Sequence, residues 1–239
     1  MPRKPPLQYL FLLLLGIGVS LPFWVGCDLR RAAGPGGEVS FQQPVKSIAV
    51  VGFRPAVPPG GETGLVRNPL VGAVHEAGPV QEEVVERMNE SLFSKLVVSK
   101  KYEFISPGQA QGALSSLLSS NSAIGEGELF VSLGKGMETD AVLAGYLYRW
   151  TEREGADYGV NRAASVAFDL YLIRSSDGVI LWKGGFDKTQ RSLAENLLDV
   201  NTFLKAKGKW MSAEALAEMG LSDLLERFPV GPVEGEIKE

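Results

Sequence analysis

The chain has a single cysteine, Cys27, which stands directly after an N-terminal apolar segment. One thiol cannot form an intramolecular disulfide, and a Cys-rich zinc site needs more thiols than this sequence contains. The only histidine, His75, excludes metal sites that require two imidazole ligands. We therefore expect a fold without disulfides, and we expect neither a metal nor a cofactor.

The N-terminal segment has the layout of a secretory signal peptide. A lysine and an arginine near the start give a short positive region, and residues 10–21 carry no charge. Gly26 followed by Cys27 resembles a bacterial lipobox, in which the cysteine follows a small residue at the cleavage site. This resemblance implies that residues 1–26 are removed and that Cys27 is the lipidation site.

Two features of this segment leave alternatives open. Trp24 departs from the lipobox pattern, where leucine is usual three residues before the cysteine. Residues 7–26 could instead remain as an uncleaved anchor, since 20 residues are just long enough to span a bilayer. Asp28 resembles the signal that keeps lipoproteins of enteric bacteria in the inner membrane. Either way, the folded part is expected in the cell envelope, attached to a membrane and facing the periplasm.

Composition divides the rest of the chain into a tether, one domain and a tail. Residues 27–44 are rich in glycine with little apolar content, which is typical of a flexible tether. We expect a single α/β domain over 45–230 and a polar tail over 231–239. Within the domain, residues 54–79 hold five prolines and five glycines, too many for a helix or a central strand. A loop of this length is often functional or mobile.

The hydrophobic pattern predicts the elements of this domain. Residues 47–53 form a continuous apolar run, typical of a strand buried on both faces. The remaining predicted elements, in order, are a helix over 80–97, a strand over 102–105, helices over 107–118 and 128–137, strands over 141–150, 165–174 and 179–186, and a helix from Ser212 to Phe228 that Gly220 and Ser222 split.

The last three predicted strands form an antiparallel meander, because the Asp177-Gly178 pair is a strong signal for a tight hairpin between two of them. The order of elements favours an α+β fold, with a single mixed sheet and helices mainly on one face.

Three aromatic residues recur at every second position of one predicted strand. Tyr146, Tyr148 and Trp150 should therefore line one face of that strand. Since Tyr and Trp are favoured at the centres of interfaces, this row is a candidate surface for a partner subunit or protein. The alternative is that the long loop or the C-terminal helix covers the row.

The search for catalytic residues finds little. His75 and Glu76 are adjacent on the long loop, where a solvated histidine is the simpler interpretation. Asp169 and Asp187 could pair as the two carboxylates of a glycoside hydrolase, but each also fits as a polar residue on a strand face. We therefore expect a protein that is not an enzyme. The net charge of −4 argues against nucleic acid as a partner.

Three sequence strings resemble one superfamily of Gram-negative envelope lipoproteins. They are Ile48-Ala49-Val50-Val51-Gly52-Phe53, Thr139-Asp140-Ala141-Val142-Leu143-Ala144-Gly145, and the hairpin from Asp169 to Trp182. The superfamily includes the curli-secretion channel lipoprotein, the Pel polysaccharide-export lipoprotein, the lipoprotein activator of penicillin-binding proteins and the N-terminal domain of the Tol-system propeller protein.

The resemblance covers roughly residues 45–190 and implies a small α/β domain. It implies a non-enzymatic, membrane-anchored lipoprotein that acts as a scaffold or gate in polysaccharide export or protein secretion, with the outer membrane favoured. Protein partners in the envelope, including further copies of the chain, follow from this expectation. The alternatives are a lipoprotein that regulates a periplasmic cell-wall enzyme and, third, an anchored enzyme acting on glycans.

Overall fold

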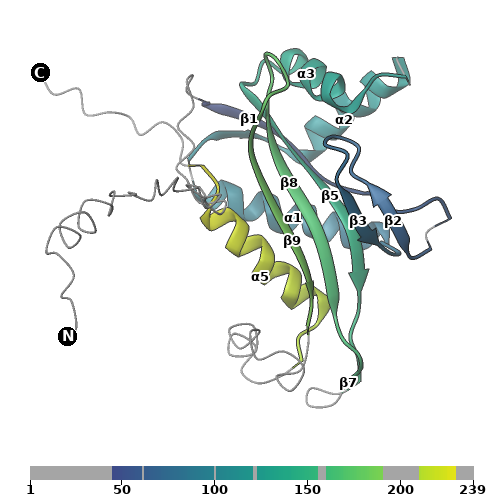
Figure 1. The fold of residues 1–239 in the computed structure, drawn as a ribbon. Helices are drawn as coiled ribbons and strands as arrows, with labels where there is room; N and C mark the ends of the chain where they lie inside the picture. The colour runs from purple at the N-terminus through teal and green to yellow at the C-terminus, as the bar shows by residue number, and fades with distance from the viewer. Residues whose placement is uncertain are drawn as a thin grey trace, which may run out of the picture. The chain divides into compact units, whose positions relative to one another are not determined.

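The computed structural model describes most of the predicted domain (Figure 1). The described residues are 45–60, 62–99, 101–120, 123–155, 160–190 and 210–229. The predicted signal peptide, tether and tail, and the lipidation site Cys27, lie outside these residues. All described residues belong to one compact unit.

The strands and helices of this unit follow one another in an order close to the predicted one. They are β1 (Ser47–Pro55), β2 (Gly64–Arg67), β3 (Val74–Ala77), α1 (Glu82–Ser99), β4 (Glu103–Ile105), α2 (Pro107–Ser120), α3 (Glu126–Gly136), β5 (Ala141–Thr151), β6 (Glu154–Gly155), β7 (Val160–Arg162), β8 (Ser165–Arg174), β9 (Ile180–Thr189) and α5 (Ala213–Glu226).

The main sheet has five strands in the order β4-β1-β5-β8-β9. β1 pairs in parallel with both β4 and β5, while β5, β8 and β9 pair antiparallel to one another. Residues 48–53 of β1 are buried, as the apolar run predicted, because both sides and both faces of this strand are covered. The predicted α+β fold with a mixed sheet is confirmed.

A tight turn joins β8 to β9 at the predicted Asp177-Gly178 pair. Gly178 has a φ of +77°, a conformation that glycine adopts without strain. The Asp177 carboxylate accepts hydrogen bonds from the backbone N–H of Val179 and from Nε of Arg174. The connection from β5 to β8 is longer and carries the small two-stranded sheet of β6 and β7.

Helices cover both faces of the main sheet, so the expectation that they lie mainly on one face is wrong. α1 and α5 pack against one face, and α2 and α3 pack against the other (Figure 1). The second face is also covered by the β2–β3 hairpin, which Figure 1 shows beside β5. Each of the four described helices therefore has a sheet face against which to bury its apolar stripe. Among the described helices, none is long and apolar enough to cross a bilayer.

The segment 54–79 contains no helix, as predicted, but its first two residues still belong to the central strand β1, and a later part folds into the β2–β3 hairpin. Hydrogen bonds attach both ends of the segment to β5. The backbone N–H of Ala56 donates to the carbonyl of Leu147, and the N–H of Gly78 donates to that of Tyr148, each over 2.9 Å. The hairpin is therefore fixed at its two ends to neighbouring residues of one strand.

α5 is a single helix, so the predicted break at Gly220 and Ser222 is wrong. Its start is as expected, because the side chain of Ser212 accepts a hydrogen bond from the backbone N–H of Ala215. Gly220 is buried inside the helix, where a Cβ would lie 2.5 Å from the ring of Phe186. The glycine permits close contact between α5 and β9 and does not end the helix.

An irregularity in β1 is held by α1. Gly52 has a φ of +78°, and the register of β1 against β5 shifts at this position. The Asn89 side chain of α1 accepts a hydrogen bond from the N–H of Phe53 and donates one to its carbonyl. A β-bulge of this kind leaves backbone groups without a partner strand, and here an amide side chain satisfies them.

Candidate functional site

The predicted aromatic row is divided by a β-bulge in β5. The register against β8 shifts between Leu147 and Arg149, which turns the following residue to the other face. Tyr146 and Tyr148 are fully buried on the face covered by α2, α3 and the hairpin. Trp150 packs against the opposite face, with α1 and α5. The prediction of one shared aromatic face is therefore wrong for Trp150, and the long loop covers Tyr148.

The hydroxyl groups beneath the hairpin converge on one carboxylate. Asp169, on β8, accepts hydrogen bonds from the hydroxyl of Tyr148 over 3.0 Å and from that of Tyr171 over 2.8 Å. Asn68, in the turn after β2, donates from its side-chain amide to both tyrosine oxygens. Burial and the nearby carboxylate raise the pKa of both tyrosines above 10, so at neutral pH each hydroxyl keeps its proton and donates.

His75 completes this group from β3. Its ring is stacked on that of Tyr148, with the centroids 3.9 Å apart and the planes 5° from parallel. Its Nε2 lies 3.3 Å from the Asp169 carboxylate, and the side chain is only 18% exposed. The prediction of a solvated histidine is therefore wrong. Glu76 points the other way and its side chain is 69% exposed, because neighbouring residues of a strand face opposite sides. We call His75, Asn68, Tyr148, Asp169 and Tyr171 the clasp cluster.

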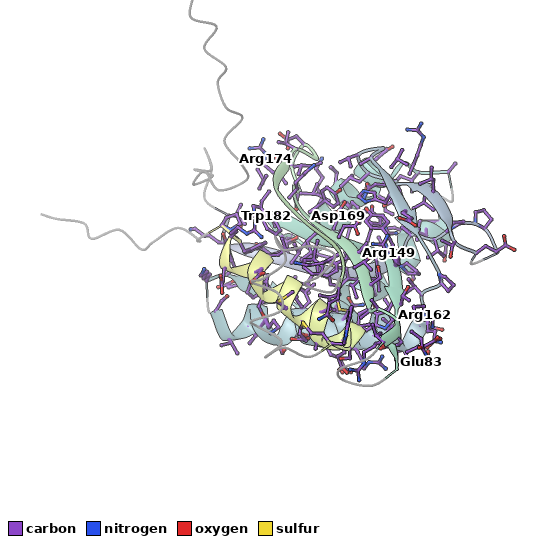
Figure 2. The ribbon with its side chains drawn as sticks, turned by 60° about the horizontal axis from the view of Figure 1, so that its bottom comes forward. Glu83, Arg149, Arg162, Asp169, Arg174 and Trp182 are labelled. Carbon is purple, nitrogen blue, oxygen red and sulfur yellow. The ribbon has the colours of Figure 1, made fainter. Side chains whose placement is uncertain are left out.

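A second set of polar contacts, centred on Arg149, ties the hairpin to three strands of the main sheet. The side chain of Arg149 is almost fully buried, with 11% of it exposed. Its guanidinium donates to the Ser165 hydroxyl over 2.7 Å, to the backbone carbonyl of Glu76 over 2.8 Å, and to the carboxylate of Asp187. Figure 2 labels Arg149 and Asp169, which come from the adjacent strands β5 and β8. An arginine within an apolar strand is the sequence signal that could have identified this contact.

A third contact lies where α3 meets the sheet. The Arg54 guanidinium donates to the Glu126 carboxylate over 2.6 Å and stacks near the rings of Phe130 and Tyr146. The Tyr146 hydroxyl donates to the same carboxylate over 3.2 Å. Burial is the main cause that raises the pKa of Tyr146, and the Glu126 charge adds to it. The face covered by α2, α3 and the hairpin, called the hairpin face below, therefore has three sets of polar contacts. The sequence had predicted an aromatic row there.

These contacts define the chemistry of the site. Asp169 is held by two tyrosine hydroxyls, and Asp187 is held by Arg149. Neither carboxylate is a free acid or base facing the other, as a glycoside hydrolase pair would be. Across the described ranges, no three His, Cys, Asp or Glu side chains are grouped so that they could hold a metal ion. The arrangement is suited to fixing the hairpin on the sheet.

Comparison with known proteins gives similarity to solved structures alone. No protein-family model and no curated protein matches the sequence. The PelC dodecamer from Paraburkholderia phytofirmans is 12% identical, with 82% of this chain and 94% of that chain covered and a TM-score of 0.40. The LpoB C-terminal domain from Salmonella enterica is 15% identical, covering 62% and 85%, with a TM-score of 0.35.

A lipoprotein from Neisseria meningitidis is 14% identical, with 67% of this chain and 96% of that chain covered and a TM-score of 0.37. A Pel protein and a lipoprotein are thus among the similar structures, and the sequence resemblance named proteins of both kinds. All these TM-scores are below 0.5, and the likeness carries no argument about what this chain binds or does.

Proposed function

We propose that this chain is a lipid-anchored, non-enzymatic lipoprotein of the bacterial cell envelope that faces the periplasm. The observation that carries the proposal is the position of Cys27, the sole cysteine, after a small residue at the end of a signal-like segment. The charge of −4 agrees with a protein that does not bind nucleic acid. The outer membrane is the proposed location, against the contrary indication of Asp28.

Within the envelope, we infer the role of a scaffold or gate in an export or assembly system. The clasp cluster supports this role, because its polar side chains are used in fastening one part of the chain to another. A catalytic site instead needs a base or nucleophile left free to reach a substrate. Here the buried carboxylate of Asp169 is already bonded to the two tyrosines beside it.

Lipid labelling tests the anchor. Cells that express the full chain are grown with a palmitate analogue, and the chain is isolated and checked for label. The wild type should carry label, and Cys27→Ser should carry none and should leave the membrane fraction or remain uncleaved. A serine substitution at an exposed position, such as Lys101→Ser, serves as the control and should keep the label. An unlabelled wild type would show that the anchor is wrong.

Assembly distinguishes the scaffold from the regulator of a cell-wall enzyme. The purified full chain is examined in detergent by light scattering, and its partners are captured by crosslinking in intact cells. A closed assembly of several copies supports the scaffold. A single copy crosslinked to a cell-wall synthase supports the regulator in its place.

A further inference from the structure

β9 forms an open edge of the main sheet. It pairs with β8 on one side, and no described strand pairs with its other side. The N–H of Gln190, just after β9, donates to the carbonyl of Ala164, so residue 190 directs its backbone groups toward β8. Because this direction alternates along a strand, the odd-numbered residues from 183 to 189 direct their N–H and C=O groups away from the sheet.

The side chains of these outward-directed residues are also accessible. Lys183, Gly185, Asp187 and Thr189 are all exposed, on the face of β9 opposite to the one that packs against α5. Lys183 forms no ion pair or hydrogen bond with the described part of the chain. Asp187 has an exposed carboxylate that Arg149 holds in place from the neighbouring strand.

We propose that the partner of this edge is a second copy of the chain, paired antiparallel through β9 with Gly185 at the two-fold axis. In this register Lys183 of each copy lies opposite Asp187 of the other, so two pairs of opposite charges form. An exposed edge strand is a ready template for such pairing, and identical strands pair isologously. The pairing does not depend on the proposed lipid anchor.

The geometry selects this register over its neighbours. Outward backbone groups occur at odd positions, so only registers that place odd residues opposite odd residues form the hydrogen bonds. Moving one β9 strand to the next allowed register in one direction places Gly185 opposite Lys183, and in the other direction opposite Asp187. In both cases Lys183 no longer lies opposite Asp187, so the charge pairs are lost.

Charge reversal tests the partner. The full chain is studied in detergent by sedimentation velocity, and the wild type should contain two copies. Lys183→Asp places like charges opposite Asp187 of the second copy and should raise the dissociation constant of the dimer at least tenfold. Lys101→Asp makes the same charge change at an exposed residue away from β9 and should leave the constant unchanged. A wild type with one copy, or equal effects of both variants, would overturn the proposal.

Cysteine pairing tests the register. Lys183→Cys and Asp187→Cys are made separately in a Cys27→Ser background, and each is checked for a cooperative melt. Directly opposite residues of a hydrogen-bonded antiparallel pair have Cα atoms about 5.5 Å apart, within the range of a disulfide. A mixture of the two variants should form a disulfide dimer under mild oxidation, and each variant alone should not. Equal crosslinking in all three samples overturns the register, whatever the lipid labelling of Cys27 shows.

Discussion

The two faces of the main sheet are covered in different ways. Two helices, α1 and α5, cover the first face, and its buried residues are mostly apolar, with Phe53, Phe168 and Leu147 among them. The second face is covered by two helices at one end and the β2–β3 hairpin at the other, and it buries tyrosines and charged groups. The difference follows from the size of the cover. A hairpin of four-residue strands buries little apolar area, so hydrogen bonds and ring stacking must hold it.

The largest expected loss of stability comes from a substitution on the face covered by α1 and α5. Phe168→Ala removes a buried ring that contacts Phe53 and Phe186 on that face, with ring centroids 5.3 Å apart in both pairs. Truncation of a buried phenylalanine costs about 3–5 kcal/mol of unfolding free energy. Urea denaturation should show this loss as one cooperative shift of the midpoint. A loss below 1 kcal/mol would show that this face is not the main source of stability.

A smaller effect is expected on the hairpin face. Asp169→Ala leaves the hydroxyls of Tyr148 and Tyr171 without an acceptor, which should cost about 1–3 kcal/mol. Adding Tyr148→Phe and Tyr171→Phe to this variant removes the unpaired hydroxyls and should recover part of the loss. Urea denaturation of the single and triple variants measures both changes. A triple variant less stable than the single would contradict the assigned hydrogen bonds.

A local effect is expected when the hairpin loses its stacked ring. His75→Ala removes the contact with Tyr148 and should reduce the opening free energy of residues 64–77 by about 0.5–1.5 kcal/mol. Hydrogen exchange should accelerate in the hairpin and stay unchanged in β1. Glu76→Ala is the matched control, because that side chain is exposed. Equal acceleration throughout the domain would mean that the hairpin and the sheet unfold as one unit.

The smallest expected effect is a loss of folding stability that begins only in alkaline solution. Burial raises the pKa of Tyr146, Tyr148 and Tyr171, whereas tyrosines of the unfolded chain ionise near 10. Above pH 10 the unfolded chain loses protons that the folded chain keeps. The stability that these groups give below pH 10 therefore decreases as the pH rises.

The opposite face offers one comparison for this pH dependence. Burial raises the pKa of Tyr102 to about 12, and its hydroxyl donates to the carbonyl of Pro229. Urea midpoints at pH 9 and pH 11 should therefore differ less in Tyr148→Phe than in the wild type, and Tyr102→Phe should reduce the difference in the same direction. If the difference between the two midpoints were the same in both variants as in the wild type, the raised pKa values would be contradicted.

The local signals in the sequence predicted the strands and helices well. The apolar run before Phe53 is a buried central strand, the Asp177-Gly178 pair forms the turn, and Ser212 caps the last helix. Each of these features depends on neighbours within a few residues. The predicted split at Gly220 was wrong because this glycine makes room for the ring of Phe186, which is distant in the sequence.

Only part of the candidate site could be predicted from the sequence, since Asn68, Tyr171 and Arg149 were not among the candidate residues. His75, Asp169, Tyr146 and Tyr148 were all singled out, and the structure brings them to one face. Their contacts are long-range, since Asn68 and Tyr148 are separated by 80 positions. The bulge that turns Trp150 away adds one residue to β5 against β8, and alternation along a single strand does not reveal it.

The attachment of segment 54–79 has a consequence for how this fold can vary. Its two ends are bonded to the adjacent residues Leu147 and Tyr148, so the chain leaves the sheet and returns to it at nearly the same point. Each doubling in the length of a flexible loop costs only about 0.6 kcal/mol. The fold can therefore accommodate longer or different segments at this position while the paths of β1, α1 and β5 stay the same.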